Sequence, residues 1–435
     1  MEQVTVIGGG LAGCEAAWQL AKRGIFVRLY EMKPEKYSPA HTYPGLAELV
    51  CSNSLRSDRI ENAVGLLKEE LRRLDSLILS CADATKVEAG GALAVDREKF
   101  SDLVSARISE NAKIELVRSE CTEIPEGKVI IATGPLTAGA MAEKIGEKLG
   151  GEMLSFYDAS APIVSFDTID MEKAFFASRY DRGEADYVNC PMNKEEYDAF
   201  VAALTTAEEA PVHGFEDKHV FEGCMPIEVM ARRGQETIAH GPLKPVGIRD
   251  PRTGKEPYAV VQLRRENAAG TAYNLVGFQT HLKHPEQRRV FRMIPGLEKA
   301  EFLRYGNMHR NTFIQSPGVL GLSYQLLAEP RIRFAGQMTG VEGYVESTAS
   351  GFAAGFALAR EILGEESIDF TAKTAIGALA HYISEGGGGV FQPMNVNFGI
   401  IEPITQRIRR KQERYAAISA RALEVIGEIT AREDF

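Results

Sequence analysis

The sequence lacks any run of about 18 apolar residues, so no membrane span is expected. The N-terminus lacks a basic region, an apolar stretch and a small-residue cleavage site in succession, so no signal peptide is expected. The six cysteines include no Cys-x-x-Cys pair and no histidine at zinc-like spacing, which argues against a disulfide framework and a metal site. These absences predict a protein of a reducing compartment, with the cytoplasm as the default.

The composition is that of an ordinary globular protein, with 44% hydrophobic and 25% charged residues. A length of 435 residues suits roughly two to three domains. The net charge of −10 does not by itself suggest a nucleic-acid partner. Because phosphates are contacted by local patches, the distribution of the cations matters more than their sum.

A strand, a glycine-rich turn and a helix open the chain. The apolar run 4–7 enters a G-x-G-x-x-G pattern made by Gly8, Gly9, Gly10, Leu11, Ala12 and Gly13. A helical pattern ends at Gly24, and a second strand, 25–31, closes on Glu31. This context predicts a dinucleotide site, with the pyrophosphate at the helix N-terminus and Glu31 on a ribose. A tight turn without a ligand is the alternative.

Two later stretches favour FAD over NAD. The segment 129–135 is a buried strand pattern that ends at Gly134, typical of the return strand of FAD-binding domains. The segment 331–359 reads as a strand, a turn with Gly336 and Gly340, and a helix of small residues. The N-terminus of that helix could meet the electron-rich edge of a flavin.

The predicted fold class is therefore α/β: a discontinuous Rossmann-type FAD-binding domain with an α+β insertion domain. The mixed strand patterns in the middle of the chain indicate the insertion. We expect the first part of the FAD-binding domain at 1–150, the insertion at 151–325, and the second part, with a C-terminal basic helix, at 326–435.

Two basic clusters stand out against the acidic total. The first cluster contains Lys283, Arg288 and Arg289, and the second contains Arg407, Arg410 and Lys411. These six cations are the candidate contacts to an RNA. In the second, the apolar residues of 406–429 recur at helical spacing, so the helix should bury one face and present its cations on the other. Such runs are usually solvated surface, and alone they do not establish an RNA partner.

The residues as a whole resemble one family. The stretches GGGLAG, CSNSLRS, GGALAVDREKF, IIATGP, YVNCPM, FRMIPGLE, MHRNTF, GQMTGVEGYVES and FQPMNVNFG, in this order, are similar to TrmFO, the folate- and FAD-dependent tRNA (uracil-5-)-methyltransferase family. The likeness covers nearly the whole chain. A weaker likeness exists to MnmG, a wobble-uridine flavoprotein that shares the FAD domain and has a long C-terminal extension.

The resemblance implies methylation of C5 of the T-loop uridine, uridine-54, in the T-arm of tRNA. It implies 5,10-methylenetetrahydrofolate as the carbon donor, reduced FAD as the hydride donor, and NADH or NADPH to reload the flavin. The product would be 5-methyluridine. No obligate protein partner is evident. The alternatives are an MnmG-like modification of the wobble uridine, an FAD oxidoreductase acting on a small metabolite, and a non-catalytic flavin-stabilised tRNA-binding protein.

Two cysteines match catalytic positions of the family. Uracil C5 becomes nucleophilic only when something adds to C6, and a thiolate is suited to that addition. The resemblance makes Cys224 this nucleophile and Cys51 a second active-site cysteine that shields or caps a reactive carbon. The remaining four, Cys14, Cys81, Cys121 and Cys190, are expected to be inert packing residues.

Three further residues have expected roles. Tyr344 could pack on the isoalloxazine ring, or it could be a core tyrosine. The resemblance suggests that His309 stacks on the pterin of the folate, although a lone histidine is often structural. Arg97 could bind cofactor or order the active site, and a structural salt bridge is equally open.

Overall fold

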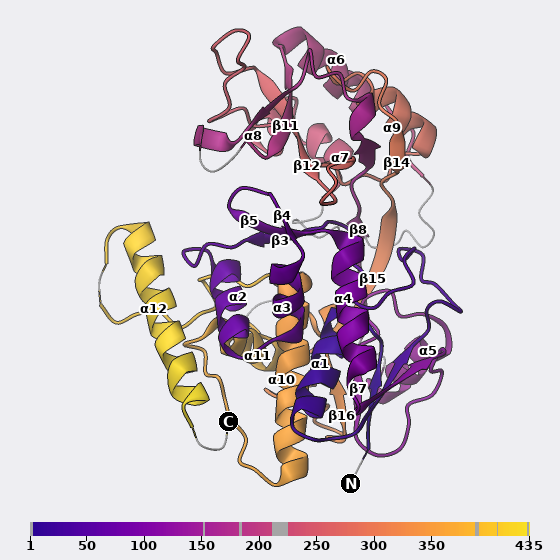
Figure 1. The fold of residues 1–435 in the computed structure, drawn as a ribbon, viewed down its shortest axis with the longest axis vertical. Helices are drawn as coiled ribbons and strands as arrows, with labels where there is room; N and C mark the ends of the chain where they lie inside the picture. The colour runs from indigo at the N-terminus through magenta and orange to yellow at the C-terminus, as the bar shows by residue number, and fades with distance from the viewer. Residues whose placement is uncertain are drawn as a thin grey trace.

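A computed structural model gives the fold (Figure 1). It describes residues 3–150, 153–181, 185–210, 225–387, 391–406, 408–432 and 435. Within these ranges it leaves the side chains of 153–159, 181 and 308–310 undescribed. In the described part of the chain, no helix is both long and apolar enough to cross a membrane.

A five-stranded sheet, in which every pairing is parallel, lies in the lower half of Figure 1. Its strands, in spatial order, are β16 (Ile332–Phe334), β7 (Val129–Ile131), β1 (Val4–Ile7), β2 (Val27–Glu31) and β6 (Ile114–Arg118). All three residues of β7 and of β16 are buried, as expected for a parallel sheet covered on both faces. Segments from both ends of the chain thus share one sheet.

Helices surround this sheet and complete the parallel-sheet unit. They are α1 (Leu11–Lys22), α2 (Ala63–Arg73), α3 (Leu77–Ala84), α4 (Arg97–Glu110), α5 (Gly139–Lys148), α10 (Tyr344–Leu363), α11 (Ala375–Glu385) and α12 (Lys411–Thr430). A short 3₁₀ turn, η4 (Gln337–Thr339), leads from β16 toward α10. One hydrophobic core joins residues from Val4 to Leu149 with residues from Phe313 to Ile429.

A second unit, the antiparallel-sheet unit, occupies the upper half of Figure 1. Its six strands, in spatial order, are β10 (Phe175–Ala177), β11 (Tyr187–Met192), β12 (Ala259–Arg265), β13 (Ala272–Leu275), β9 (Ile163–Ser165) and β14 (Phe302–Arg304). It also holds η1 (Phe166–Thr168), η2 (Arg179–Asp181), α6 (Lys194–Thr205), α7 (Ile227–Arg232), α8 (Thr237–His240) and α9 (His284–Phe291). Its separate core runs from Ala161 to Ala300.

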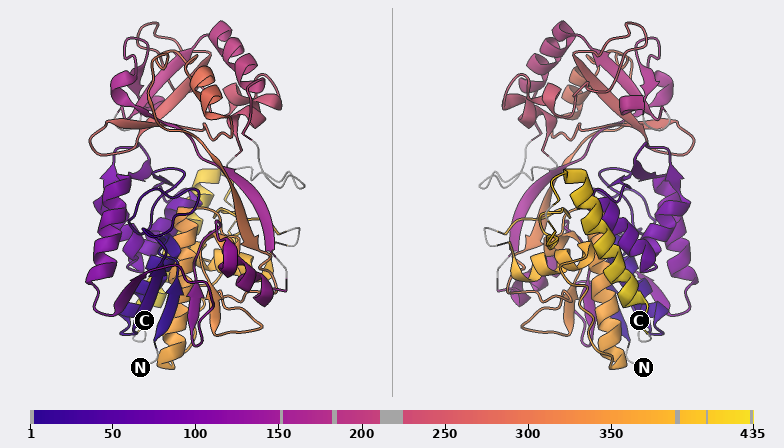
Figure 2. Two further views of the ribbon diagram at one scale, coloured as in Figure 1. Left: turned by 90° about the vertical axis from the view of Figure 1, so that its right-hand side faces the viewer. Right: turned by 90° about the vertical axis from the view of Figure 1, so that its left-hand side faces the viewer.

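Two smaller sheets lie where the units meet. The long strands β8 (Met153–Ala159) and β15 (Met308–Ile314) pair antiparallel and curve from one unit to the other, as Figure 2 shows. A three-stranded sheet of β3 (Ser54–Ser57), β4 (Lys86–Val87) and β5 (Ala92–Val95) lies between the two units.

The predicted fold class is confirmed: a parallel α/β sheet built from both ends of the chain, with an insertion between. The boundaries expected at 150/151 and 325/326 stay predictions.

The C-terminal helix begins later than expected, at Lys411 rather than 406, and Arg410 is its N-cap. Its first turn still contains the cations Lys411 and Arg414, which oppose the macrodipole, together with Glu413, which complements it. Its buried apolar residues are Ile418, Ala422, Ile426 and Ile429, which recur at helical spacing, so the helix buries one face as the pattern predicted.

Candidate active site

The turn between β1 and α1 brings three backbone segments into contact. Gly8 has a φ of +105°, and a Cβ built on it would lie 2.4 Å from the carbonyl oxygen of Ala132, just after β7. A Cβ on Gly13 would lie 1.8 Å from the carbonyl oxygen of Gly8. Around Gly10, in contrast, there is no atom within 4 Å of a built Cβ. Gly8 and Gly13 therefore close the turn, and Gly10 opens it to solvent.

The N-terminus of α1 is free to take an anion. Its N-cap, Gly10, supplies no capping side chain, and the first turn contains no acidic residue. The first N–H groups of the helix, which begins with Leu11 and Ala12, have no intrahelical partner. A pyrophosphate would satisfy these donors and would be favoured by the helix dipole.

Glu31, the last residue of β2, lies against this turn. Its carboxylate accepts hydrogen bonds from the backbone N–H of Gly9 at 2.9 Å and of Lys33 at 2.9 Å. The residue is 7% exposed. Each carboxylate oxygen keeps a second lone pair. Glu31 thus fixes the turn and can also accept a hydrogen bond from a ribose hydroxyl.

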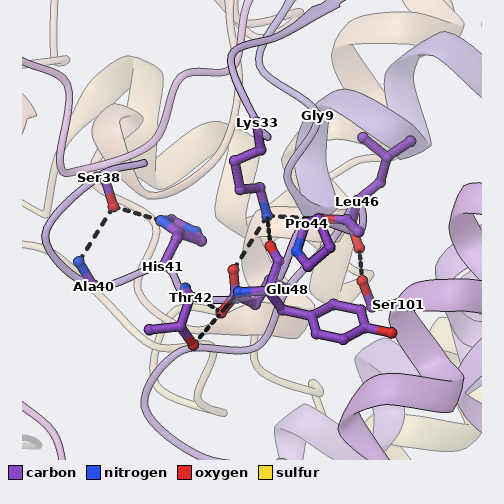
Figure 3. Close-up of polar contacts among 12 residues, drawn as sticks. Gly9, Lys33, Ser38, Ala40, His41, Thr42, Pro44, Leu46, Glu48 and Ser101 are labelled. Atoms are coloured by element: carbon purple, nitrogen blue, oxygen red, sulfur yellow. Dashed lines mark hydrogen bonds and ion pairs between the residues drawn. The ribbon is translucent and has the colours of Figure 1, made fainter. Parts of the chain in front are cut away.

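The loop that follows Glu31 folds back over the turn, as Figure 3 shows. Lys33 forms an ion pair with Glu48 at 3.2 Å, and the two side chains are only 4% and 7% exposed. Lys33 Nζ also donates to the carbonyl oxygen of Gly45 at 2.7 Å, and the N–H of Ala47 donates to Gly9 at 2.9 Å. This buried pair could not be predicted, because a lysine and a glutamate 15 residues apart form no recognisable motif.

The C-terminal half of the chain supplies the other wall of the site. The helix α10 packs directly on α1: a Cβ on Gly351 would lie 2.2 Å from the carbonyl oxygen of Ala12. Gly134 and Gly336 have left-handed φ values of +77° and +85° in the turns after β7 and β16. Gly340 also has a left-handed φ, of +92°, and it packs against Phe391, whose nearest ring carbon would lie 2.4 Å from a Cβ there.

These features fit a dinucleotide cofactor of the FAD type. The cradle at Gly10 is open, Glu31 is positioned at the end of the second strand, and α10, like α1, begins without a side-chain cap. In the described part of the chain, no group of three or more His, Cys, Asp or Glu side chains could hold a metal ion.

Cys51, which precedes β3, contacts Tyr344, the first residue of α10. The Tyr344 hydroxyl accepts from the backbone N–H groups of Cys51 at 2.9 Å and Ser52 at 3.2 Å. The same hydroxyl donates to Cys51 Sγ at 3.1 Å. Burial, reinforced by Cys51, raises the pKa of Tyr344 well above its usual value. The phenol therefore keeps its proton and remains a donor to the sulfur.

The segment that follows Cys51 is held by the antiparallel-sheet unit. The side chain of Asn53 is fully buried and donates to the carbonyl oxygens of Val95 and Arg265, each at 2.9 Å. Arg264, on β12, donates to Asn53 Oδ1 at 3.0 Å and to Ser52 Oγ at 2.6 Å. These contacts fix the polar residues of the CSNSLRS stretch beside Cys51. Nothing in the sequence around Arg264 indicates this role.

Arg97, at the N-terminus of α4, is already engaged by the protein. Its guanidinium pairs with Glu266 at 2.8 Å and also donates to the carbonyl oxygen of Leu49, two residues before Cys51. The side chains of Arg97 and Glu266 are 16% and 5% exposed. This position suits ordering of the Cys51 segment.

The other described cysteines behave as packing residues. Cys14, Cys81 and Cys190 are fully buried, and burial raises the pKa of Cys81 to about 11 and of Cys190 to about 12. Burial also raises the pKa of Cys121, whose Sγ contacts the carbonyl oxygen of Glu123. Cys224 lies outside the described residues.

Some expected site residues are only partly placed. The backbone of His309 lies on β15, opposite Asp158 of β8, but its side chain is not described. Arg407 lies outside the described residues. The two basic clusters are not brought together, because α9 and α12 lie on opposite sides of the molecule in Figure 1.

Several of the basic side chains have partners within the protein. Lys283 pairs with Glu208 at 2.6 Å, Arg289 with Glu286 at 2.6 Å and Arg410 with Glu413 at 3.1 Å. Lys411 lies 5.4 Å from the ring centroid of Tyr415. Arg288 instead donates to the hydroxyl of Tyr305.

Fold and site together define a dinucleotide-binding α/β protein with an antiparallel insertion. Residues 3–366 match the family model described as "GIDA: Glucose inhibited division protein A". The solved structure of GidA from Aquifex aeolicus in its form II crystal aligns with a TM-score of 0.72 at 15% identity. The alignment covers 100% of this chain and 74% of that one, and at this identity it indicates the fold alone.

Two relatives are much more similar. The methylenetetrahydrofolate–tRNA-(uracil-5-)-methyltransferase TrmFO of Acetivibrio thermocellus is 59% identical over 433 residues, covering 99% of each chain. The protein of the same name from Pelotomaculum thermopropionicum is 60% identical over 424 residues, covering 97% of each chain. The chain therefore belongs to the GidA-type proteins and, within them, to the TrmFO family.

Proposed function

We propose that this protein methylates C5 of the T-loop uridine, uridine-54, of tRNA to give 5-methyluridine. The carbon comes from 5,10-methylenetetrahydrofolate. One observation carries the proposal: relatives that bear the name of this activity are 57–60% identical to the chain over nearly their whole length. The MnmG-like alternative is not favoured, since these full-length relatives are named TrmFO.

Bound FAD, in its reduced form, would supply the hydride that completes the methyl group, and NADH or NADPH would restore it. The residues proposed to hold it are those of the two glycine-rich turns: Gly8, Gly9, Gly10, Leu11, Ala12, Gly13, Gly134, Gly336 and Gly340, with Glu31 and Tyr344. The open cradle at Gly10 and the ready carboxylate of Glu31 support this assignment.

Cys224 is proposed as the nucleophile. Its thiolate would form an S–C6 bond to the uracil ring, and the π electrons of C5=C6 would move to C5 as an enolate. C5 would then attack the methylene carbon of the folate, with cleavage of one of its two carbon–nitrogen bonds. Loss of the C5 proton would expel tetrahydrofolate by cleavage of the second carbon–nitrogen bond and leave an exocyclic methylene on C5. Addition of a hydride to this methylene and departure of the thiolate from C6 would complete the methyl group and restore the C5=C6 bond.

Cys51 is proposed to face this chemistry from the α10 side of the site. Its sulfur receives the hydrogen bond of Tyr344, which favours the thiolate over the thiol. Arg97 orders the same segment through Leu49 and Glu266, and with His309 it is proposed to face the folate. The role given to Cys51 is to shield or cap the reactive carbon.

The tRNA would be bound by the cations Lys283, Arg288, Arg289, Arg407, Arg410 and Lys411. Because contacts to phosphate release counterions, tRNA affinity should fall steeply with salt. The thiols of Cys14, Cys81, Cys121 and Cys190 are free, which suits a reducing compartment, and we propose that the enzyme acts in the cytoplasm.

The test is an omission assay on the purified yellow protein. Unmodified tRNA, 5,10-methylenetetrahydrofolate and NAD(P)H together should give 5-methyluridine, and omission of any one should abolish it. Cys224→Ala should be inactive, whereas Cys190→Ala, a buried cysteine away from the site, should keep activity if it folds. Full activity of Cys224→Ala would refute the assignment of the nucleophile.

A further inference from the structure

Four aromatic rings run in series from the core of the antiparallel-sheet unit to its surface. Phe291 is fully buried, and its ring centroid lies 6.5 Å from that of Phe302. The ring of Phe302 stacks on Tyr305 at 5.2 Å with an interplanar angle of 10°. Tyr305 stacks on His284 at 4.5 Å and 12°. We call these four residues the aromatic ladder.

His284, the first residue of α9, is the exposed end of the ladder. One face of its imidazole is covered by Tyr305, and its Nε2 lies 3.0 Å from Oδ1 of Asn307, which fixes the ring in its plane. Among the rings that the structure describes, none stacks on the opposite face. A fixed, flat, open aromatic surface therefore ends the ladder.

A cation accompanies this surface. Arg288, one turn along α9, donates to the hydroxyl of Tyr305 from Nε at 3.0 Å and from the terminal nitrogen at 2.7 Å. Its neighbours Lys283 and Arg289 are paired with the carboxylates of Glu208 and Glu286. No carboxylate in the described part of the chain lies within ion-pair distance of Arg288, so none of these carboxylates neutralises its charge.

We propose that the open face of His284 is a stacking site for one unpaired nucleobase of the tRNA, with Arg288 contacting a neighbouring phosphate. The inference rests on the proposed function for the identity of the RNA. Unpaired RNA bases bind proteins by stacking on aromatic side chains, while guanidinium groups engage phosphates. The stacked ring of His284 could hold a base, and the neighbouring guanidinium of Arg288 could hold a phosphate. The site lies in the antiparallel-sheet unit (Figure 1), apart from the glycine turn in the other unit.

The experiment measures the Kd of the FAD-loaded protein for an unmodified tRNA transcript at several salt concentrations. His284→Phe and His284→Leu form the matched pair, because both are apolar and only phenylalanine keeps an aromatic face. We expect His284→Phe to bind like the wild type and His284→Leu to bind roughly five-fold more weakly or worse. His240→Leu, at an exposed histidine of α8, should change nothing.

The salt dependence separates stacking from charge. His284→Leu should leave the slope of log Kd against log salt unchanged, and Arg288→Gln should reduce it by about one. Equal Kd values for His284→Phe and His284→Leu would overturn the proposal. The proposed function is judged separately: a wild type that makes no 5-methyluridine refutes the function even if the two variants differ in tRNA binding.

Discussion

At the scale of single residues, the hydroxyl of Tyr344 organises the candidate active site. It accepts from two consecutive backbone N–H groups and donates to the sulfur between them. A phenol with a raised pKa is a donor throughout the physiological pH range, so the sulfur of Cys51 always faces an O–H group. Such a contact favours the thiolate over the thiol.

Tyr344→Phe should therefore raise the pH at which Cys51 becomes reactive. A hydrogen bond to a charged acceptor contributes about 1.5–3 kcal/mol, so the midpoint should move up by on the order of one pH unit. The measurement is the rate of iodoacetamide alkylation of the Cys51 peptide, followed by mass spectrometry across pH. Tyr258→Phe, which changes a tyrosine of the other unit, is the control. An identical midpoint in both variants would show that Tyr344 does not act on the sulfur.

At the scale of elements, the crossing of α1 and α10 positions both candidate cofactor contacts. Gly351 and Gly355 let the backbone of α10 lie directly on Ala12 and Ala16 of α1. The two helices begin at the glycine turn and at Tyr344, so their spacing sets the width of the site between them.

Gly351→Ala should disturb this crossing. Its Cβ would lie 2.2 Å from a backbone oxygen, which cannot move without shifting α1. We expect a loss of about 1–3 kcal/mol in the free energy of unfolding and weaker retention of FAD. Gly427→Ala, in α12, is the matched control: a Cβ there meets no atom within 4 Å, so it should stabilise by about 0.5–1 kcal/mol. Flavin fluorescence during thermal unfolding reports both effects, and similar outcomes for the two variants would contradict the account.

A buried carboxylate joins two other helices. Glu70 of α2 is fully buried and accepts from the N–H groups of Ala375 and Ile376 at the start of α11, at 2.7 and 2.9 Å. Burial raises the pKa of Glu70 from 4.5 to about 7, although the two N–H groups act to lower it. The folded protein therefore keeps a proton that the unfolded chain loses first.

The sign of the pH dependence follows from this difference. Between pH 4.5 and pH 7, the unfolded state loses the Glu70 proton and the folded state retains it, so the free energy of unfolding falls as the pH rises. The loss should reach about 3 kcal/mol at most. Glu70→Gln removes this titrating group and with it this pH dependence. The difference in stability between wild type and Glu70→Gln, from guanidinium unfolding, should shrink or reverse over this window; a constant difference would contradict the assigned pKa.

The elements nearest the glycine turn were predictable because their pattern is local. A β-branched run, spaced glycines and Glu31 all lie within 28 residues, and the structure places them as expected. The contacts of Arg264 with Ser52 and Asn53 were not predictable, because they join residues more than 200 positions apart. Their only sign was the excess of serine and asparagine around Cys51.

At the scale of the whole molecule, the candidate site depends on both units. The parallel-sheet unit supplies the turn, Glu31, Cys51 and Tyr344, while β12 of the antiparallel-sheet unit holds the Cys51 segment through Arg264. The exposed end of the aromatic ladder, His284 of the antiparallel-sheet unit, is the surface proposed for an RNA base. The insertion thus orders the Cys51 segment of the candidate site, and it also carries the proposed RNA-binding surface at His284.

The most direct test of the central claim follows the methyl carbon. The FAD-loaded protein is incubated with unmodified tRNA, NADPH and 5,10-methylenetetrahydrofolate labelled with ¹³C in its methylene group, and the tRNA is digested to nucleosides for mass spectrometry. The account predicts one ¹³C-labelled 5-methyluridine per tRNA, at the T-loop position. Uridine left unmodified by protein that holds FAD and binds the tRNA, or a methyl group without the label, would contradict it.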